Sequence, residues 1–361
     1  MAAFIALPYR LYKDEPKWIA PLLLSQKSLF DLKKNPFWKT CDHVFFIAIK
    51  NGKTVGRIAC IFHHDYFKTA AEPTGFFGFL DAEDDPDVFK NLLHNAEAWL
   101  GTRSCQKIIG PVNPSINYEM GTLISGFEFP PYLMMTYNFE YYNKRIVAEA
   151  YTKEMDFFAY YTGKNAPTLS GKMDRIIELT QKKYALHLRP VSKSKFYTEL
   201  DILHNIYNDA FSKHYGFVAM TKDEFMFMGK DMAKIVDEQL LLIAEYNKEP
   251  IGFILALPNY NEVFGKIKNG KLFPGGWLKF LYYKSKIKSI RILTIAIKQK
   301  YRHLGVGAYL YREIIRTSAE KKMEHGEMSW IAENNIQMNK AALEMGAVLT
   351  KKYRLYCKQL S

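Results

Sequence analysis

Two stretches of the chain share one hydrophobic pattern, which indicates that the protein contains two similar halves. Residues 44–62 and 240–257 each hold two apolar runs around a short polar turn, which is Asn51-Gly52 in the first stretch. Apolar runs of this length around a polar turn are typical of β-hairpins, and Asn-Gly is a strong hairpin signal. A further apolar run follows each hairpin, at 74–80 and at 290–297, and a stretch with helical periodicity comes next. The pattern predicts hairpin, strand and helix in the same order twice.

The halves differ in the segment that joins this strand to this helix. In the second half, Arg302, Gly305 and Gly307 lie between the strand at 290–297 and a helix predicted over 309–324. Glycine permits backbone conformations and close approaches that a side chain forbids. The first turn of the helix directs unpaired N–H groups, and the positive end of the helix dipole, at whatever lies in front of it. Such a turn predicts a binding site for a pyrophosphate.

This loop differs from two common phosphate-binding types. A P-loop requires Lys-Ser or Lys-Thr directly after its glycines, and neither pair is present here. A dinucleotide fingerprint requires three glycines after the first strand of a parallel unit, whereas this loop has too few glycines and comes late in the chain. The Arg-x-x-Gly-x-Gly pattern, with the order of strands and helices around it, resembles the GNAT superfamily of N-acyltransferases over about residues 172–361. The resemblance implies that backbone amides of the loop hold the pyrophosphate of acyl-coenzyme A, and it implies no metal ion.

The corresponding segment of the first half is acidic. Residues 81–87 contain five carboxylates and no glycine, and their charge would repel a pyrophosphate. Acidic residues are also favourable at the start of a helix, because they face the positive end of its dipole. We therefore expect the N-terminal copy to bind no coenzyme.

The resemblance implies an α+β fold with two tandem GNAT-like domains. Each domain is expected to be a mostly antiparallel sheet with a splayed pair of parallel strands, flanked by helices. We expect a degenerate domain over 1–163, a linker over the polar stretch 164–171 and an acyltransferase domain over 172–361.

The resemblance also implies roles for particular residues of the second half. It places the backbone of Ile295 and Ile297 along the pantetheine arm of the coenzyme, in the gap where two parallel strands diverge. It assigns the pyrophosphate to Arg302 and the residues after it, although an exposed loop position is the alternative for Arg302. The expected coenzyme-binding residues are Ile295, Ile297, Arg302, Leu304, Gly305, Val306, Gly307, Ala308 and Asn335.

Acyl transfer from a thioester to an amine requires a base for the amine and a donor for the oxyanion. Glu333, at the end of the strand predicted at 326–333, is the candidate catalytic base, since burial would raise its pKa toward a useful value. The alternative is that Glu333 caps the following helix. Many GNAT enzymes have a tyrosine in this helix as the acid for the thiolate, but the position is Ala342 here. Either Tyr353 or Tyr356 supplies the proton, or the thiolate leaves unaided.

Four short motifs resemble a narrower group, the bacterial ceramide synthase-like tandem GNAT proteins. They lie at 13–22, 110–119, 333–339 and 352–356. The resemblance implies N-acylation of a long-chain sphingoid amine. The second motif concentrates hydrogen-bonding groups, although asparagine and proline at this density are also typical of a turn. The residues expected to bind the substrate are Asn113, Asn117, Tyr118 and Glu119.

Composition restricts the class and the location of the protein. Forty-eight per cent apolar and 24 per cent charged residues are ordinary values for a globular chain. No apolar run approaches the roughly 18 residues of a membrane span, and the apolar N-terminal start is too short for a signal peptide. The four cysteines have neither metal-site nor redox-motif spacing. We expect a reduced, cytoplasmic protein.

Positive charge is concentrated in one segment. Residues 263–291 hold seven lysines, one arginine and no acid, and they account for eight of the 13 net positive charges. Aromatic residues are interleaved with the lysines. Three roles fit this composition: a solvated excursion, an element at a membrane surface, or contact with nucleic acid, which we consider the least favoured.

The function expected from these features is acyl-coenzyme A-dependent N-acyl transfer to a primary amine. The acyl group is acetyl or long-chain, and a sphingoid or other lipid amine is the suggested acceptor. One alternative is a Fem-like aminoacyl transferase that uses charged tRNA, although a tRNA-bound donor has no need of the intact glycine loop. The other is a non-catalytic protein that binds coenzyme A or docks on a membrane, which the missing tyrosine permits.

Overall fold

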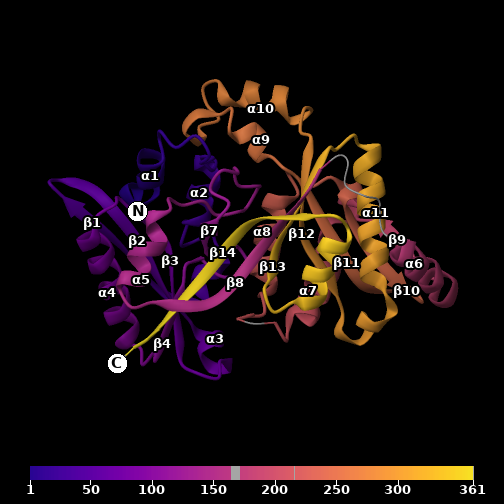
Figure 1. Ribbon diagram of the computed structural model, residues 1–361, viewed down its shortest axis with the longest axis horizontal. Coiled ribbons are helices and arrows are strands. Elements are labelled where there is room, and N and C mark those ends of the chain that lie inside the picture. Colours follow the sequence, from indigo (N-terminus) through magenta and orange to yellow (C-terminus); the bar gives the residue numbers. More distant parts are fainter. Residues whose placement is uncertain (164–170, 215, 361) are drawn as a thin grey trace. The chain divides into compact units, whose positions relative to one another are not determined.

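The computed structural model describes residues 1–163, 171–214 and 216–360, and it divides into two compact units (Figure 1). The N-terminal unit comprises Met1–Phe158, Asn261–Lys284 and Thr350–Ser361. The C-terminal unit comprises Ala159–Tyr260 and Ser285–Leu349. Within the described residues, each helix is too short or too polar to span a bilayer.

The N-terminal unit is built on a sheet in which the strands follow the order β1-β2-β3-β4-β14. Among the described residues, β3 and β4 pair in parallel, and the β1–β2, β2–β3 and β4–β14 pairs are antiparallel. The short strand β7 also pairs with β14. The strands are β1 (Cys41–Lys50), β2 (Lys53–His63), β3 (Thr74–Ala82), β4 (Lys107–Gly110), β7 (Thr122–Ser125) and β14 (Val348–Gln359), with a separate pair β5 (Val112–Asn113) and β6 (Glu119–Met120). The helices are α1 (Ala2–Leu11), α2 (Leu23–Leu29), α3 (His64–Thr69), α4 (Pro86–Gly101), α5 (Tyr141–Ala148), α9 (Asn261–Phe264) and α10 (Gly276–Lys284).

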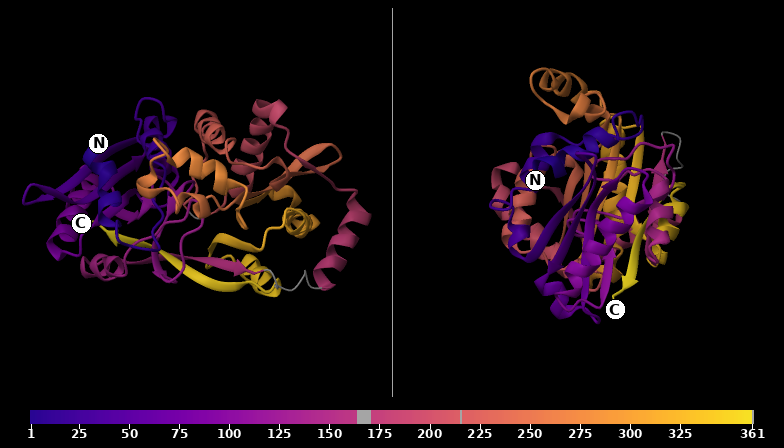
Figure 2. Two further views of the ribbon diagram at one scale, coloured as in Figure 1. Left: turned by 90° about the horizontal axis from the view of Figure 1, so that it is seen from above. Right: turned by 90° about the vertical axis from the view of Figure 1, so that its left-hand side faces the viewer.

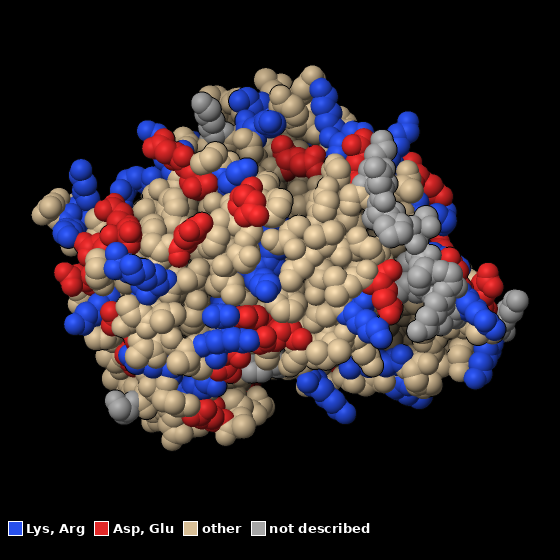
Figure 3. All heavy atoms as spheres, in the orientation of Figure 1, with Lys and Arg blue, Asp and Glu red and all other residues tan. Residues whose placement is uncertain are grey.

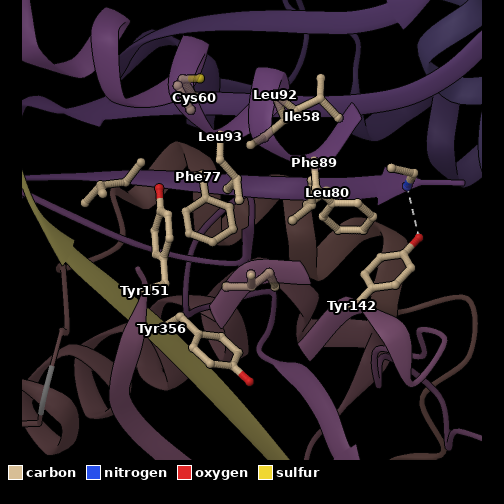
Figure 4. Packing of buried hydrophobic residues seen from close by; sticks show 14 of the residues in the cluster. Ile58, Cys60, Phe77, Leu80, Phe89, Leu92, Leu93, Tyr142, Tyr151 and Tyr356 are labelled. Atoms are coloured by element: carbon tan, nitrogen blue, oxygen red, sulfur yellow. Dashed lines mark hydrogen bonds between the residues drawn. The ribbon is translucent and has the colours of Figure 1, made fainter. Parts of the chain in front are cut away.

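Strand β2 shows how the core of this unit forms. Its neighbouring residues point to opposite faces of the sheet, as the pleat requires. A Cβ atom added to Gly56 would lie 2.7 Å from a methyl group of Val88 on α4, whereas Arg57 donates a 2.8 Å hydrogen bond to the Phe4 carbonyl on α1. Helices α4 and α1 therefore cover opposite faces, and β2 is buried almost throughout. Figure 4 shows the α4 side of this core, where the Ala82 N–H also donates to the Tyr142 hydroxyl.

The C-terminal unit has a sheet of strand order β9-β10-β11-β12-β13. Among the described residues, the β12–β13 pair is parallel, and the β9–β10, β10–β11 and β11–β12 pairs are antiparallel. The strands are β9 (His187–Pro190), β10 (Leu241–Tyr246), β11 (Glu249–Pro258), β12 (Ser289–Ile297) and β13 (His325–Ala332). The helices are α6 (Gly171–Tyr184), α7 (Phe196–Phe211), α8 (Lys222–Met232), α11 (Val306–Glu320) and α12 (Ile336–Glu344), and both α7 and α11 pack against β11 and β12.

The predicted repeat is present in the structure. Each unit has an antiparallel hairpin, then a strand, a helix and a second strand parallel to the first; these are β1-β2-β3-α4-β4 and β10-β11-β12-α11-β13. Both hairpin turns have two consecutive residues with positive φ, Asn51-Gly52 and Asn247-Lys248. Such turns match the twist of the flanking strands. The predicted mixture of helices with mostly antiparallel sheets, each containing one parallel pair, is therefore confirmed.

Some segments on each side of the predicted division, 1–163 and 172–361, belong to the compact unit of the other side. Strand β14 begins in the C-terminal unit, but from Thr350 onward it belongs to the N-terminal unit, where Tyr356–Gln359 pair with β4. Strand β8 (Thr152–Thr162) also has residues in both units. The segment 261–284 belongs to the N-terminal unit, where the Asn261 side chain donates a 2.8 Å hydrogen bond to the Pro131 carbonyl. The predicted linker, 164–171, lies outside the described residues except for its last residue.

Candidate functional site

The parallel strands β12 and β13 diverge part of the way along their length. Their registered pairs begin at Ser289 and His325 and end at Ile292 and Met328. Strand β12 then continues to Ile297, paired only on its other side with β11, and β13 continues to its own end. The divergence was predicted, and it leaves an edge of β12 beside which an extended ligand can bind.

A β-bulge lies at the point of divergence. In the β11–β12 ladder, Thr294 pairs with Leu255 and Ile292 pairs with Ala256, so Leu293 is an extra residue on β12. A bulge leaves the extra residue outside the regular ladder. The Leu293 backbone amide is therefore a candidate for the oxyanion donor that the chemistry requires. The hydrophobic pattern did not indicate the bulge, since residues 290–297 are apolar apart from Arg291 and Thr294 and neither marks Leu293 as an extra residue.

The predicted glycine loop lies directly after β12 and leads into α11. A short 3-10 helix, η5 (Gln299–Leu304), precedes Gly305, which has φ 71° and is the N-cap of α11. This left-handed conformation favours glycine, because a Cβ atom would crowd the backbone. The next residues, Val306, Gly307 and Ala308, form the first turn of α11, whose N–H groups have no acceptor within the helix. The backbone donors predicted for the pyrophosphate thus lie together at one helix end.

Gly307 has no such conformational requirement. A Cβ atom at this position would lie 3.4 Å from Ile297 Cδ1 and 3.7 Å from Ile295 Cδ1, which are ordinary contacts. Packing within the chain would therefore accept alanine, although glycine inside a helix is about 1 kcal/mol less favourable. The missing side chain leaves space at the start of α11, as close approach of a pyrophosphate requires. The same contacts show that the side chains of Ile295 and Ile297 face α11, so their predicted role concerns the backbone.

Arg302 anchors the loop to helix α7. Its guanidinium donates to the carbonyl of Ala210 near the end of α7, although the residue is otherwise exposed. The Gln299 N–H donates a 2.7 Å hydrogen bond to the Asp209 carboxylate on the same helix. Leu304, the last residue of η5, is buried. These bonds position the loop, while phosphate binding by Arg302 stays a prediction.

Glu333 follows directly after β13. The N-cap of α12 is Asn335, whose side-chain oxygen accepts a 3.2 Å hydrogen bond from the Met338 N–H, so the alternative role of Glu333 as the cap is wrong. The same bond gives Asn335 a structural function beside its predicted contact with pantetheine. Glu333 is partly exposed, although the sequence led us to expect a buried carboxylate. Its role as the base stays a prediction.

Asn339 holds the chain at Glu333. Its side-chain nitrogen donates to the carbonyl of Ala332 at 2.9 Å and to the carbonyl of Glu333 at 3.3 Å, and its oxygen accepts a 3.0 Å hydrogen bond from the Tyr160 hydroxyl. No sequence pattern pointed to Asn339, although it is the last position of the motif at 333–339.

A buried polar network lies where β12 and β13 still pair. Arg291 and Glu327 are register partners, and both are almost completely inaccessible to solvent. Arg291 Nε donates to Ser329 Oγ at 2.9 Å, and Ser329 Oγ donates to Glu327 Oε1 at 2.8 Å. The Arg291 guanidinium also lies 4.8 Å from the centre of the Trp330 ring. In the sequence, Arg291 was noticed only as part of the basic segment, although an arginine inside an apolar strand was a signal for a buried partner.

The four residues predicted to bind the substrate lie in one hairpin of the N-terminal unit. Strand β5 pairs with β6 through Asn113 and Glu119. Asn113 has a structural role as well, because its side-chain oxygen accepts the N–H of Phe79, a residue with positive φ. The Asn117 N–H donates to Ser115 Oγ at 3.2 Å, and the Tyr118 ring packs against Phe37. The hairpin brings the four together, and their contact with a substrate stays a prediction.

The acidic segment of the N-terminal unit has structural partners. Asp81 pairs with Arg57 at 2.7 Å. Asp85 accepts a 3.0 Å hydrogen bond from the Asp87 N–H as the N-cap of α4, and it pairs with Lys50 at 2.6 Å. The predicted helix-start chemistry is confirmed, and carboxylates lie where the C-terminal unit has glycines.

The candidates for the general acid lie in the N-terminal unit. Tyr356 belongs to its core and donates a 2.8 Å hydrogen bond to the Asn143 side chain, and burial raises the pKa of its hydroxyl. Tyr353 is also buried in the part of β14 that belongs to this unit. Ala342 is completely buried in α12. Across the residues that the structure describes, no cluster of three or more His, Cys, Asp or Glu side chains is arranged to hold a metal ion.

Comparisons with known proteins agree with this geometry. The model of the Acetyltransferase (GNAT) family matches residues 200–347, which include β12, the glycine loop, α11 and β13. Protein YghO of Escherichia coli (strain K12) is 36% identical over 369 residues, which cover 100% of this chain and 93% of that protein. Bacterial ceramide synthase of Caulobacter vibrioides is 34% identical over 371 residues, which cover 99% of this chain and 94% of that protein.

Solved structures resemble the fold at low sequence identity. A tandem GNAT protein from the clavulanic acid biosynthesis pathway has a TM-score of 0.55 and 9% identity, covering 99% of this chain and 95% of that chain. A GCN5-related N-acetyltransferase from Sphaerobacter thermophilus has a TM-score of 0.50 and 10% identity, covering 95% of both chains. These similarities support the fold alone, and the first confirms the predicted tandem arrangement.

Proposed function

The chain belongs to the acetyltransferase (GNAT) family and is an N-acyltransferase, and we propose that it transfers an acyl group from acyl-coenzyme A to a lipid amine. The observation that carries the proposal is the start of α11, where the left-handed Gly305 caps the helix and Gly307 in its first turn has no side chain, directly after the strand β12 that diverges from β13. The donor pyrophosphate would contact the N–H groups of this turn, because a helix N-terminus favours an anion. The pantetheine arm would extend along the backbone of Ile295 and Ile297.

The residues at the divergence supply the chemical groups that acyl transfer needs. The amine nitrogen attacks the thioester carbonyl carbon, a C–N bond forms, the C–S bond breaks, and the amine proton passes to Glu333 directly or through water. The Leu293 amide donates to the oxyanion. The sulfur leaves as a thiolate and takes its proton from solvent, since Ala342 replaces the tyrosine that many members of the family carry.

The acceptor is proposed from the relatives. A protein that is 34% identical over nearly the whole chain is called a bacterial ceramide synthase, and ceramide is the N-acyl product of a sphingoid base. We infer a long-chain primary amine as the acceptor, held by the hairpin that contains Asn113, Asn117, Tyr118 and Glu119. An enzyme with such an acceptor meets its substrate at a membrane surface, which makes a peripheral location in the cytoplasm the expected one.

Calorimetric titration tests the donor. Coenzyme A, acetyl-coenzyme A and palmitoyl-coenzyme A would be added to the wild type and to Gly305→Glu, which places an acid at the start of α11. Gly101→Glu is the matched control, because a side chain there would meet no atom within 4 Å. We expect micromolar binding of the long-chain donor that Gly305→Glu abolishes and Gly101→Glu retains. Absence of binding for all three compounds would contradict the donor assignment.

Mass spectrometry of the product tests the acceptor. The wild type would be incubated with palmitoyl-coenzyme A and either a sphingoid base or a short primary amine. Formation of the N-acyl sphingoid base, with stoichiometric release of free thiol, is the expected result. A preference for the acetyl donor and the short amine would agree with N-acyl transfer as the reaction, but it would contradict a lipid amine as the acceptor.

A further inference from the structure

Helix α10 presents large apolar side chains to solvent. Of the eighteen large apolar residues that are exposed among those described, five lie within residues 273–282. On α10 these are Trp277, Leu278, Leu281 and Tyr282, with exposed fractions of 42%, 57%, 49% and 59%; Phe273, just before the helix, is 69% exposed. An isolated exposed apolar residue is ordinary, but a cluster of this kind marks an interaction surface.

The four residues of α10 form one continuous face. At 100° per residue, the spacing i, i+1, i+4, i+5 covers roughly 140° of the helix circumference. The opposite side is directed inward, because Phe280 stacks on the buried Phe264 with ring centres 6.4 Å apart. A surface helix usually turns its apolar face toward the core, whereas α10 turns this apolar face away from the body of the N-terminal unit.

The segment that carries α10 is anchored to the N-terminal unit. Besides the Asn261 bond to Pro131, the turn at Gly270 approaches so closely that an added Cβ would lie 2.0 Å from the Pro21 carbonyl oxygen. Ile267 is buried as well. Figure 2 shows α10 at the outer end of this segment, clear of the sheet of the N-terminal unit. The apolar face is thus held in place by the fold and does not belong to a loose tail.

Positive charge borders the apolar face. Lys271, Lys279 and Lys284 are exposed, and the sequence has no acid from 263 to 291. Along the upper edge of Figure 3, where α9 and α10 lie, basic side chains (blue) lie beside residues that are neither Lys, Arg, Asp nor Glu (tan). Tryptophan and tyrosine are enriched where hydrocarbon meets lipid headgroups, and lysines nearby attract anionic headgroups.

We propose that the outer face of α10, formed by Trp277, Leu278, Leu281 and Tyr282, docks the protein on an anionic lipid bilayer. The apolar side chains enter the boundary between headgroups and acyl chains, and the lysines contact the phosphates. The docking needs neither donor nor acceptor, so it stands apart from the acyl transfer proposed above. A nucleic-acid partner explains the lysines but leaves the leucines exposed.

Sedimentation with vesicles tests the proposal on the full chain. Wild type would be mixed with phosphatidylcholine vesicles that either contain or lack phosphatidylglycerol. The test variant carries Trp277→Ser, Leu278→Ser, Leu281→Ser and Tyr282→Ser together. The matched control carries Leu24→Ser and Ile49→Ser, which change exposed apolar residues elsewhere in the same unit. Circular dichroism and the melting temperature establish that each variant is folded.

Binding of the wild type to the anionic vesicles is expected, with at least tenfold weaker binding to pure phosphatidylcholine. The α10 variant should lose at least tenfold in binding, and the control variant should match the wild type. A second variant, Lys271→Gln with Lys279→Gln and Lys284→Gln, should lose binding to anionic vesicles. Absence of binding by the folded wild type, or equal binding by the α10 variant, would overturn the proposal. Conversion of a dimer to a monomer in the α10 variant, without vesicle binding by the wild type, would assign the face to a second copy instead.

Discussion

Arg291 and Glu327 are register partners on the parallel strands β12 and β13, and the hydroxyl of Ser329 connects their side chains. All three residues are buried; Arg291 and Glu327 form the second-last registered pair, and Ser329 follows directly after the last one. Burying a charge is costly unless it is paired, so this network is sensitive to the loss of one member. It joins the two strands at the base of the gap in which we place the thioester.

We expect Arg291→Met to lower the free energy of unfolding by about 3 kcal/mol, because the Glu327 carboxylate stays buried without this partner. Urea unfolding followed by circular dichroism measures the effect. Arg316→Met is the matched control, since Arg316 is exposed and its ion pairs with Glu313 and Glu320 lie on a helix surface. That change should cost less than about 1 kcal/mol. Equal stability of the two variants would show that the buried network contributes little.

The two glycines of the loop should respond differently to alanine. At Gly305, alanine would have to adopt φ near 71° and should destabilise the protein by about 1–2 kcal/mol. At Gly307, alanine should preserve stability or raise it by up to about 1 kcal/mol, since the added methyl group makes only ordinary contacts within the chain. Gly307→Ala should nevertheless weaken coenzyme A binding about tenfold or more, because the methyl group occupies the space that we assign to the pyrophosphate. Melting temperatures and calorimetric titration separate these effects, and normal coenzyme affinity in Gly307→Ala would exclude the assignment.

Glu333→Gln should lower kcat by about 10²–10⁴ with little change in donor binding, because the amide cannot accept the amine proton. Asn339→Ala should lower kcat less, since Asn339 acts by holding the Glu333 carbonyl. The pH profile distinguishes the two roles: the limb that reports the base should disappear in Glu333→Gln and persist in Asn339→Ala. Glu344→Gln, an exposed change on the same helix α12, should leave kcat unchanged. Full activity of Glu333→Gln would require another base.

His63 should make stability depend on pH. The residue is buried, and burial lowers its pKa from 6.5 to about 4. Its Nδ1 accepts the Tyr66 N–H, and its Nε2 lies 3.2 Å from the Thr40 hydroxyl, which itself donates to the Phe37 carbonyl. This arrangement requires the neutral ring with its proton on Nε2.

In the unfolded chain His63 takes up a proton below pH 6.5, whereas in the folded chain it stays neutral down to about pH 4. The contribution of the neutral ring to stability is therefore complete above pH 6.5, and it falls by about 3 kcal/mol as the pH decreases to 4. Urea unfolding of the wild type and of His63→Gln over this range measures the difference. Parallel curves for the two proteins would show that His63 does not cause the dependence.

Much of the fold could be predicted because the signals are local. The Asn51-Gly52 turn, the apolar runs on either side of it and the strand–glycine–helix order are visible within short windows of the chain. The structure confirms the hairpins and the repeat. The position of Glu333 at the end of β13 was also predictable, since β13 was expected at 326–333 and ends at Ala332.

Other features of the candidate site depend on register and on partners far apart in sequence. Nothing in the pattern at 290–297 showed that Leu293 is a bulge, because a bulge is defined only by the strand beside it. The role of Asn339 depends on the carbonyls of Ala332 and Glu333 and on the Tyr160 hydroxyl, which lies 179 positions away in the chain. Arg302 matched a phosphate-binding motif, and its bond to Ala210 became visible only when α7 was placed beside the loop.

By itself, the sequence determined the repeated elements, the glycine loop, the acidic segment of the first half and the concentration of lysines at 263–291, because each is encoded in neighbouring residues. Only the tertiary structure decided which unit holds the segments 261–284 and 350–361, how Arg291 meets Glu327, and which face of α10 is exposed. The physical reason is that burial and strand register depend on many contacts between residues that are distant in sequence and compete for the same space. A local sequence pattern does not specify those contacts.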